Sequence, residues 1–67
     1  KPPYEKLQCD VAGYILGGQL VLDIKDDQER TLRPGDGFYV PKGVEHRGFA
    51  VGEETVRLIT VFSPARY

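Results

Sequence analysis

The chain has 67 residues, which corresponds to one small domain. A chain of this length buries only roughly 60% of its unfolded surface, so stability must come from tight packing, a bound ion or an oligomeric interface. Nine Lys and Arg residues against ten Asp and Glu residues give a net charge of -1, without the basic excess that binding to a phosphate backbone requires. We therefore expect no nucleic-acid partner.

Cys9 is the single cysteine, so an internal disulfide is excluded and a reducing compartment, the cytoplasm, is predicted. The chain has no run of about 18 apolar residues, and its charged, proline-containing start differs from the apolar core of a signal peptide. We therefore expect a soluble domain with no membrane partner. The chain starts abruptly, without Met and close to a predicted strand, which leaves open that residues 1–67 lack N-terminal strands of a longer protein.

Eight Gly and five Pro residues separate short segments at intervals of about 8 to 12 residues, a spacing typical of antiparallel β-structure. Residues 7–11 alternate apolar and polar side chains with a period of two, which predicts a half-buried strand. The Gly17-Gly18 pair predicts a tight hairpin with a strand on each side.

In the strand after this hairpin, Leu20, Leu22 and Ile24 share one face, and the other face is more polar. Residues 25–30 then predict a turn. Further strands are expected at residues 38–40, 45–50 and 55–62. Both faces of the last strand carry apolar side chains, which predicts burial against the interior on one side and against a partner on the other. The whole chain is therefore predicted to be antiparallel all-β.

Gly35, Pro41, Gly43 and His46 follow the spacing G, five residues, PxG, two residues, H, which resembles the second motif of the cupin superfamily. Residues 14–24 resemble the family's YVLEGELEL hairpin, and residues 61–66 resemble the VFSPPR ending of many small cupins. This resemblance implies a single all-β, antiparallel jelly-roll barrel of the cupin type over residues 1–67, with a ligand or metal held in the barrel mouth. It also implies a homodimer, joined through an apolar sheet face or an exchanged N-terminal strand.

The first motif of the family, HxH, three or four residues, E, six residues, G, is degenerate in this chain. Counting back from Gly18 puts Glu5 and Leu7 at the His positions and Val11 at the Glu position. Counting from the preceding glycine instead recovers one carboxylate, Asp10. We prefer the first count because odd-numbered residues form the apolar face expected to line the barrel, so that Asp10 points outward.

His46, the only histidine, is the first candidate for a metal ligand or a general base. Together with Glu5 and Cys9, which share the lumen in the preferred count, it defines a reduced ligand set for one divalent transition metal: Zn, Fe, Mn or Ni. Alternatively, His46 is a remnant of an ancestral site that is hydrogen-bonded to a carboxylate such as Glu45 or Glu5. Glu5 is otherwise a solvated charge near the chain end, and Cys9 a small core residue.

Tyr14 and Tyr39 are candidates for offering hydroxyl groups to a polar ligand in the barrel mouth, or else they pack with their hydroxyls at the surface. Arg47 follows His46 directly in the predicted strand and should therefore face the other way. Asp36 follows a Pro-Gly turn and is predicted to bond neighbouring backbone amides.

Three functions follow from these observations. The first is a barrel without an intact metal triad that binds a small polar or carbohydrate-like ligand near His46. The second is a metal-dependent cupin enzyme of the dioxygenase, isomerase, lyase or uronate-processing type, with a divalent ion held by the reduced ligand set. The third is a structural or oligomerisation domain of a longer protein. The fold does not decide among them, and the residues do not identify a reaction.

Overall fold

A computed structural model describes residues 2–64, and these form two antiparallel sheets of three strands each. The strands are β1 (Cys9–Gly17), β2 (Gln19–Ile24), β3 (Glu29–Leu32), β4 (Gly37–Val40), β5 (His46–Val51) and β6 (Arg57–Pro64). One sheet has the order β4-β1-β6 and the other has the order β3-β2-β5. The predicted all-β, antiparallel fold class is therefore confirmed.

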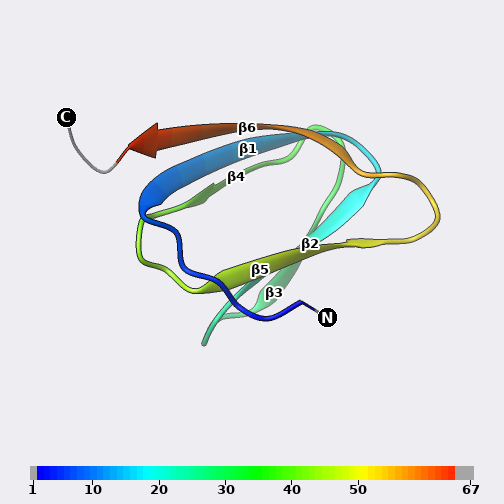
Figure 1. Cartoon of the computed structure of the whole chain (residues 1–67). Coiled ribbons are helices and arrows are strands. Elements are labelled where there is room, and N and C mark those ends of the chain that lie inside the picture. Colours follow the sequence, from blue (N-terminus) through cyan, green and yellow to red (C-terminus); the bar gives the residue numbers. More distant parts are fainter. Residues whose placement is uncertain (1, 65–67) are drawn as a thin grey trace.

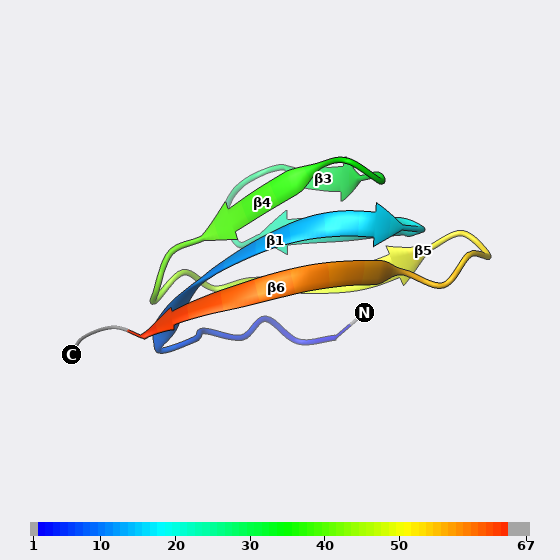
Figure 2. The same cartoon turned by 90° about the horizontal axis from the view of Figure 1, so that it is seen from above.

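The two sheets lie face to face as the layers of a sandwich (Figure 1). Seen from above, β4 lies over β3, β1 over β2 and β6 over β5 (Figure 2). Apolar residues from both layers meet between them because successive side chains of a strand point to opposite faces. The core cluster consists of Val11, Ile15, Leu22, Leu32 and Val40.

The amphipathic pattern predicted for β2 is confirmed. Leu22 belongs to the core, and Leu20 and Ile24 pack against it. The opposite face is more buried than its polar composition indicated, since Val21 and Asp23 are 7% and 4% exposed. Asp23 is the one buried charged side chain among residues 2–64, and its partners are described below.

The prediction of a hairpin at Gly17-Gly18 is wrong, because β1 and β2 belong to different sheets. The chain instead turns a corner from one layer to the other. Gly18 has the predicted positive φ, 74°. A Cβ atom there would lie 2.7 Å from the carbonyl oxygen of Thr55 and 2.8 Å from the Cα atom of Val56. Glycine is therefore required by close packing of two backbone segments as well as by the dihedral angle.

Several predicted strand limits also change. The two strands predicted before the glycine pair form one continuous strand, β1, which begins at Cys9 instead of Leu7 and includes Gly17. The turn after β2 is shorter than expected, because Glu29 and Arg30 pair with Asp23 and Leu22. These pairs depend on contacts across the sheet, which outweigh the local polarity of residues 25–30.

The predicted burial of both faces of the last strand does not occur within a single chain. Ile59 and Val61, on the outer face of β6, are 54% and 63% exposed. Leu58 and Phe62, which pair with the buried Ile15 and Val11 and so share their inner face, are 38% and 56% exposed. Both faces of β6 are therefore open to solvent in the described part of the chain.

Gly13 and Phe38 are cross-strand partners in the β1–β4 ladder. A Cβ atom added to Gly13 would collide with the Phe38 ring. Phe38 is partly buried and packs against the core. The ring thus occupies the volume that the missing side chain of Gly13 leaves free on the inner face.

Candidate functional site

The inner surface of the sandwich is open along β5 and β6. On β5, Gly48 and Ala50 pair with Leu22 and Leu20, which places them on the inner face, yet both are exposed. Their small size leaves the facing side chains of β6 uncovered. His46 begins β5 on the same face, opposite Ile24. The candidate site is this open side of the sandwich, defined by residues 46–51 and 57–64.

His46 is half-buried and its ring is held by one hydrogen bond. Its Nδ1 atom lies 3.0 Å from the carbonyl oxygen of Val44. A carbonyl oxygen only accepts hydrogen bonds, so Nδ1 must carry the proton. In the neutral ring Nε2 therefore keeps its lone pair, and this atom can accept a hydrogen bond, accept a proton or bind a metal ion.

Glu5 lies directly beside His46. The two residues form an isolated antiparallel bridge, in which the Glu5 amide donates to the His46 carbonyl at 2.8 Å and the His46 amide donates to the Glu5 carbonyl at 2.9 Å. Side chains of such a pair project from the same face. The hydrogen bond of the ring goes to Val44, not to the carboxylates of Glu5 or Glu45 that the remnant interpretation named as partners.

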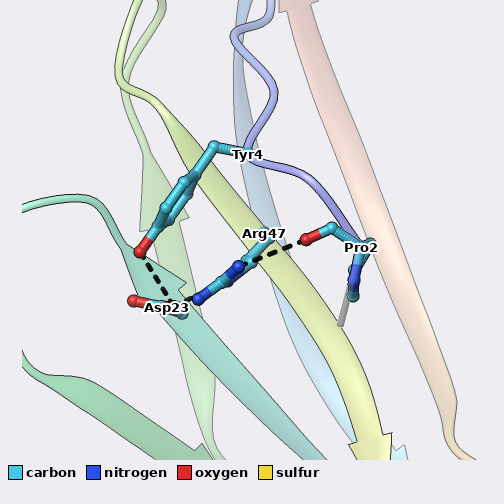
Figure 3. Close-up of polar contacts among 4 residues, drawn as sticks. All are labelled: Pro2, Tyr4, Asp23 and Arg47. Atoms are coloured by element: carbon cyan, nitrogen blue, oxygen red, sulfur yellow. Dashed lines mark hydrogen bonds and ion pairs between the residues drawn. The ribbon is translucent and has the colours of Figure 1, made fainter.

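The segment that carries Glu5, residues 2–7, is fastened to the outer face of the second sheet by a polar cluster (Figure 3). Asp23 Oδ2 accepts hydrogen bonds from the Tyr4 hydroxyl at 3.0 Å and from Arg47 Nε at 2.7 Å. Arg47 also donates from Nη1 to the Pro2 carbonyl at 3.3 Å, and its guanidinium carbon lies 4.3 Å from the centroid of the Tyr4 ring. Arg47 thus faces away from His46, as predicted.

Desolvation raises the pKa of the Tyr4 hydroxyl, and its hydrogen bond to the Asp23 carboxylate raises it further. The neutral phenol is therefore the form that holds the cluster together. Sequence reasoning missed this cluster because its members come from residues 2–4, from β2 and from β5. The detectable signal was Asp23, the one charged residue of a strand in which four of the six residues are apolar.

The other candidate residues are distributed over both faces. Cys9 is a half-buried free thiol at the start of β1, opposite Pro64. Tyr14 and Tyr39 pair with Ile59 and Ala12 and lie on the outer face of their sheet, 49% and 57% exposed. The structure therefore does not bring the two tyrosines together with His46.

Asp10 points outward, as the preferred count predicts. Its Oδ1 atom accepts a hydrogen bond from the Lys42 amide at 2.7 Å. A side-chain hydrogen bond with Asp10 raises the pKa of Tyr39. Asp36 Oδ2 accepts from the Arg33 amide at 2.9 Å, which confirms its predicted role in the turn.

The residues present do not fit a metal centre. Within residues 2–64, no group of three or more His, Cys, Asp and Glu side chains is arranged to hold a metal ion. Glu5 and His46 are neighbours, but Cys9 does not complete a ligand set with them. Two protein ligands fall short of the three or four that stable sites use. We therefore derive no chemical step through a metal.

Residues 2–64 enclose no pocket, so the open side is an exposed surface in this state of the molecule. The described residues also contain no helix of the length and apolarity needed to cross a membrane.

Two layers of antiparallel strands, with a histidine on the inner face of β5 after a Pro-x-Gly turn, define a cupin-type sandwich. The profile of the cupin domain family matches residues 8–62, and the chain therefore belongs to this family. No curated protein matches the chain.

Among solved structures, the chain is similar to a protein of Salmonella typhimurium LT2 described as a candidate ethanolamine utilization protein Q. The TM-score is 0.74 at 25% sequence identity, and the match covers 94% of this chain and 49% of that one. The chain thus spans about half the length of the similar protein.

Proposed function

We propose that this cupin domain binds a small, hydroxyl-bearing polar ligand, of carbohydrate-like chemistry, beside His46. The observation that carries the proposal is the hydrogen bond from His46 Nδ1 to the Val44 carbonyl. This bond fixes the ring and leaves Nε2 as an acceptor on the inner face of β5.

Glu5 supports the same ligand chemistry. Its carboxylate accepts hydrogen bonds when ionised, so His46 and Glu5 present two acceptors side by side. A ligand with adjacent hydroxyl groups can donate to both at once, whereas a ligand with only acceptor groups cannot. The pair therefore favours polyols and sugars over simple anions.

The inner face of β6 supplies an apolar counterpart. β5 begins at the end of the molecule where β6 terminates (Figure 1). His46 is the first residue of β5, and Phe62 is the sixth of the eight residues of β6. The Phe62 side chain is 56% exposed on the inner face. Sugar rings combine hydroxyl groups with an apolar face, and binding sites for such ligands combine a few polar groups with aromatic surface.

The test is a titration of the 67-residue chain with a neutral hexose, a hexuronate and ethanolamine, the compound in the description of the similar Salmonella protein. Amide chemical shifts would locate binding and give its affinity. We expect shifts around residues 5, 46 and 62. His46→Ala should weaken binding about tenfold or more, because about 1.4 kcal/mol corresponds to one hydrogen bond of this kind.

His46→Gln keeps a polar group near the position of Nε2 and should bind better than His46→Ala. Gln19→Ala is the matched control, since Gln19 is exposed on the outer face of β2. Equal affinities for His46→Ala and the wild type would overturn the proposal. So would shifts confined to the outer faces.

A metal-binding experiment distinguishes a metal-dependent cupin enzyme from the proposed ligand-binding domain. Zn, Fe, Mn and Ni are added singly, and the metal content of wild type and His46→Ala is measured by plasma mass spectrometry. Near-stoichiometric metal that is lost in His46→Ala would replace the proposed ligand site by a metal centre. Failure of every ligand and every metal would favour the structural or oligomerisation domain.

The cytoplasm is proposed as the compartment of this activity. Cys9 is a free thiol, and a reducing compartment keeps such a thiol unpaired.

A further inference from the structure

Glu5 carries a negative charge beside His46 that the described residues do not balance. Arg47, the residue after His46, lies on the outer face of the sheet, where its Nε atom is 2.7 Å from Asp23 Oδ2. Its guanidinium group is therefore committed to the buried Asp23 carboxylate, on the opposite side of the sheet from the Glu5 side chain.

A second cation near the start of β5, Lys25, is also paired with another carboxylate. Its Nζ atom lies 3.6 Å from Glu45 Oε1, and its amide donates to the Glu45 carbonyl at 3.0 Å. Among residues 2–64, no Lys, Arg or His nitrogen forms an ion pair with the Glu5 carboxylate. Because Glu5 is also exposed, its carboxylate is accessible to a positively charged group of a ligand.

The His46 ring and the Glu5 carboxylate are neighbours that form no hydrogen bond with each other within the described residues. The two main-chain hydrogen bonds of their bridge, 2.8 and 2.9 Å, fix the residues side by side. With Nδ1 directed to the Val44 carbonyl, the neutral ring offers an acceptor, Nε2, next to the acceptor oxygens of the carboxylate. Two adjacent acceptors require a ligand with adjacent donors, and an ammonium group forms the stronger, charge-assisted hydrogen bond to a carboxylate.

We propose that the ligand of this site carries an ammonium group next to a hydroxyl group, as amino sugars do. The ammonium group pairs with the Glu5 carboxylate, and the hydroxyl group donates to His46 Nε2. This inference rests on the proposed function and narrows its ligand class from neutral polyols to positively charged ones. Ile24, which pairs with His46 on the side away from Glu5 and packs against the core, offers apolar contact to the carbon atoms of the sugar ring.

The same charge selects against anions. A hexuronate carries a carboxylate of its own, which is repelled by that of Glu5 and brings no proton to His46 Nε2. A neutral sugar keeps its hydrogen bonds and lacks only the ion pair. We therefore expect affinity to fall from the amino sugar to the neutral sugar, and from the neutral sugar to the hexuronate.

The test is an amide chemical-shift titration of the 67-residue chain at neutral pH with glucosamine, glucose and N-acetylglucosamine. Glucosamine has an ammonium group in place of one hydroxyl of glucose, and N-acetylglucosamine keeps the nitrogen without its charge. Glucosamine should bind about threefold or more tighter than the other two, as an exposed ion pair predicts. This preference should shrink in about 1 M salt, where the screening length is about 3 Å.

Two variants locate the charge that is responsible. Glu5→Gln keeps the size of the side chain and removes its charge, so it should bind glucosamine and glucose with equal affinity. Glu45→Gln is the matched control, because it removes the same charge from the residue before His46, whose carboxylate pairs with Lys25. It should retain the preference. Protection of the Glu5 and His46 amides from exchange verifies that the bridge persists in each variant.

Equal binding of glucosamine and glucose by the wild type overturns this inference, and leaves the proposed function intact where glucose shifts the signals around His46. A preference that persists in Glu5→Gln, or that N-acetylglucosamine shares, also overturns it, because the pair of ammonium group and carboxylate is then not its cause. If no sugar shifts the signals of residues 5 and 46, the proposed function fails and this inference fails with it. A preference that is lost in Glu5→Gln and kept in Glu45→Gln supports the assigned ligand class.

Discussion

The two long sides of the sandwich are stabilised by different forces. On the side of β3 and β4, the inner face is closed by apolar residues, and Ile15 and Val40 are 0% and 1% exposed. On the side of β5 and β6, small residues on β5 and exposed residues on β6 leave the inner face open. Within residues 2–64, the sandwich is therefore closed on one side and open on the other.

On the outer face of β2 and β5, polar contacts hold the N-terminal segment. Tyr4 and Arg47 converge on Asp23 and hold residues 2–7 against the sheet, and this places Glu5 beside His46. The comparison shows that the buried core lies toward β3 and β4, whereas the proposed site lies on the exposed part of the same two sheets toward β5 and β6.

The largest expected effect tests the closed side. Ile15→Ala removes a fully buried side chain and should lower the free energy of unfolding by about 3 kcal/mol. Ile59→Ala removes the same atoms from a residue that is 54% exposed, and should cost less than about 1 kcal/mol in the monomer. Urea unfolding at low protein concentration measures both. Equal losses would contradict the division into closed and open sides.

The corner at Gly18 is expected to be nearly as sensitive. Gly18→Ala introduces a Cβ atom at a positive φ and against the backbone of residues 55–56, and should cost about 2 to 3 kcal/mol. Gly52→Ala has a similar φ, 82°, with no atom within 4 Å, and should cost about 1 kcal/mol. Thermal unfolding of the two variants separates dihedral strain from the backbone collision. The interpretation fails if Gly52→Ala is the more harmful change.

The polar cluster on the outer face of β2 and β5 should contribute less to stability than the core but more than a surface ion pair. Arg47→Met removes the guanidinium 2.7 Å from the buried Asp23 carboxylate and should cost about 2 kcal/mol. Lys25→Met removes the cation of a pair 3.6 Å apart whose side chains are about half exposed, and should cost less than about 0.5 kcal/mol.

Urea unfolding gives these two values, and amide exchange of residues 4–6 reports whether the segment detaches in Arg47→Met. Continued protection of the Glu5 amide in that variant would show that Arg47 does not hold the segment.

The smallest expected effect is a pH dependence. The pKa of Tyr4 is raised above its ordinary value of 10.0, so its neutral hydroxyl stabilises the folded state below about pH 10. This contribution is lost as pH rises through the higher pKa of the folded state. Tyr39, on the other sheet, has a pKa raised by Asp10 and acts in the same direction.

Wild type should therefore lose more stability above pH 10 than Tyr4→Phe does, and the variant with both tyrosines replaced by Phe should lose least. Urea midpoints at neutral and alkaline pH measure this loss. Parallel curves for wild type and the double variant would contradict the assigned role of the two hydroxyls.

Sequence reasoning identified what depends on local pattern. Alternation placed His46 and Arg47 on opposite faces, and the Gly17-Gly18 pair marked a sharp turn, at which Gly18 has a positive φ. Asp10 was assigned outward on the same grounds. These features follow from a period of two and from backbone sterics, which a sequence displays directly.

Features that depend on contacts between residues far apart in the sequence could not be predicted from local patterns. Whether the strands around Gly18 pair with each other is decided by the competing partners β4, β5 and β6. The contact of Tyr4 with Asp23 joins residues 19 positions apart. Apolar patterning of β6 predicted burial of both faces, but both faces are exposed in the described part of the chain.

The packing of the Phe38 ring over Gly13 also specifies the register in which β4 pairs with β1. β4 has only four residues, so few hydrogen bonds choose among its possible alignments along β1. A slip of two residues would bring the ring against Val11 or Ile15, where a side chain already fills the space. The aromatic ring and the glycine therefore favour one register of β4 on β1 and disfavour registers shifted by two residues.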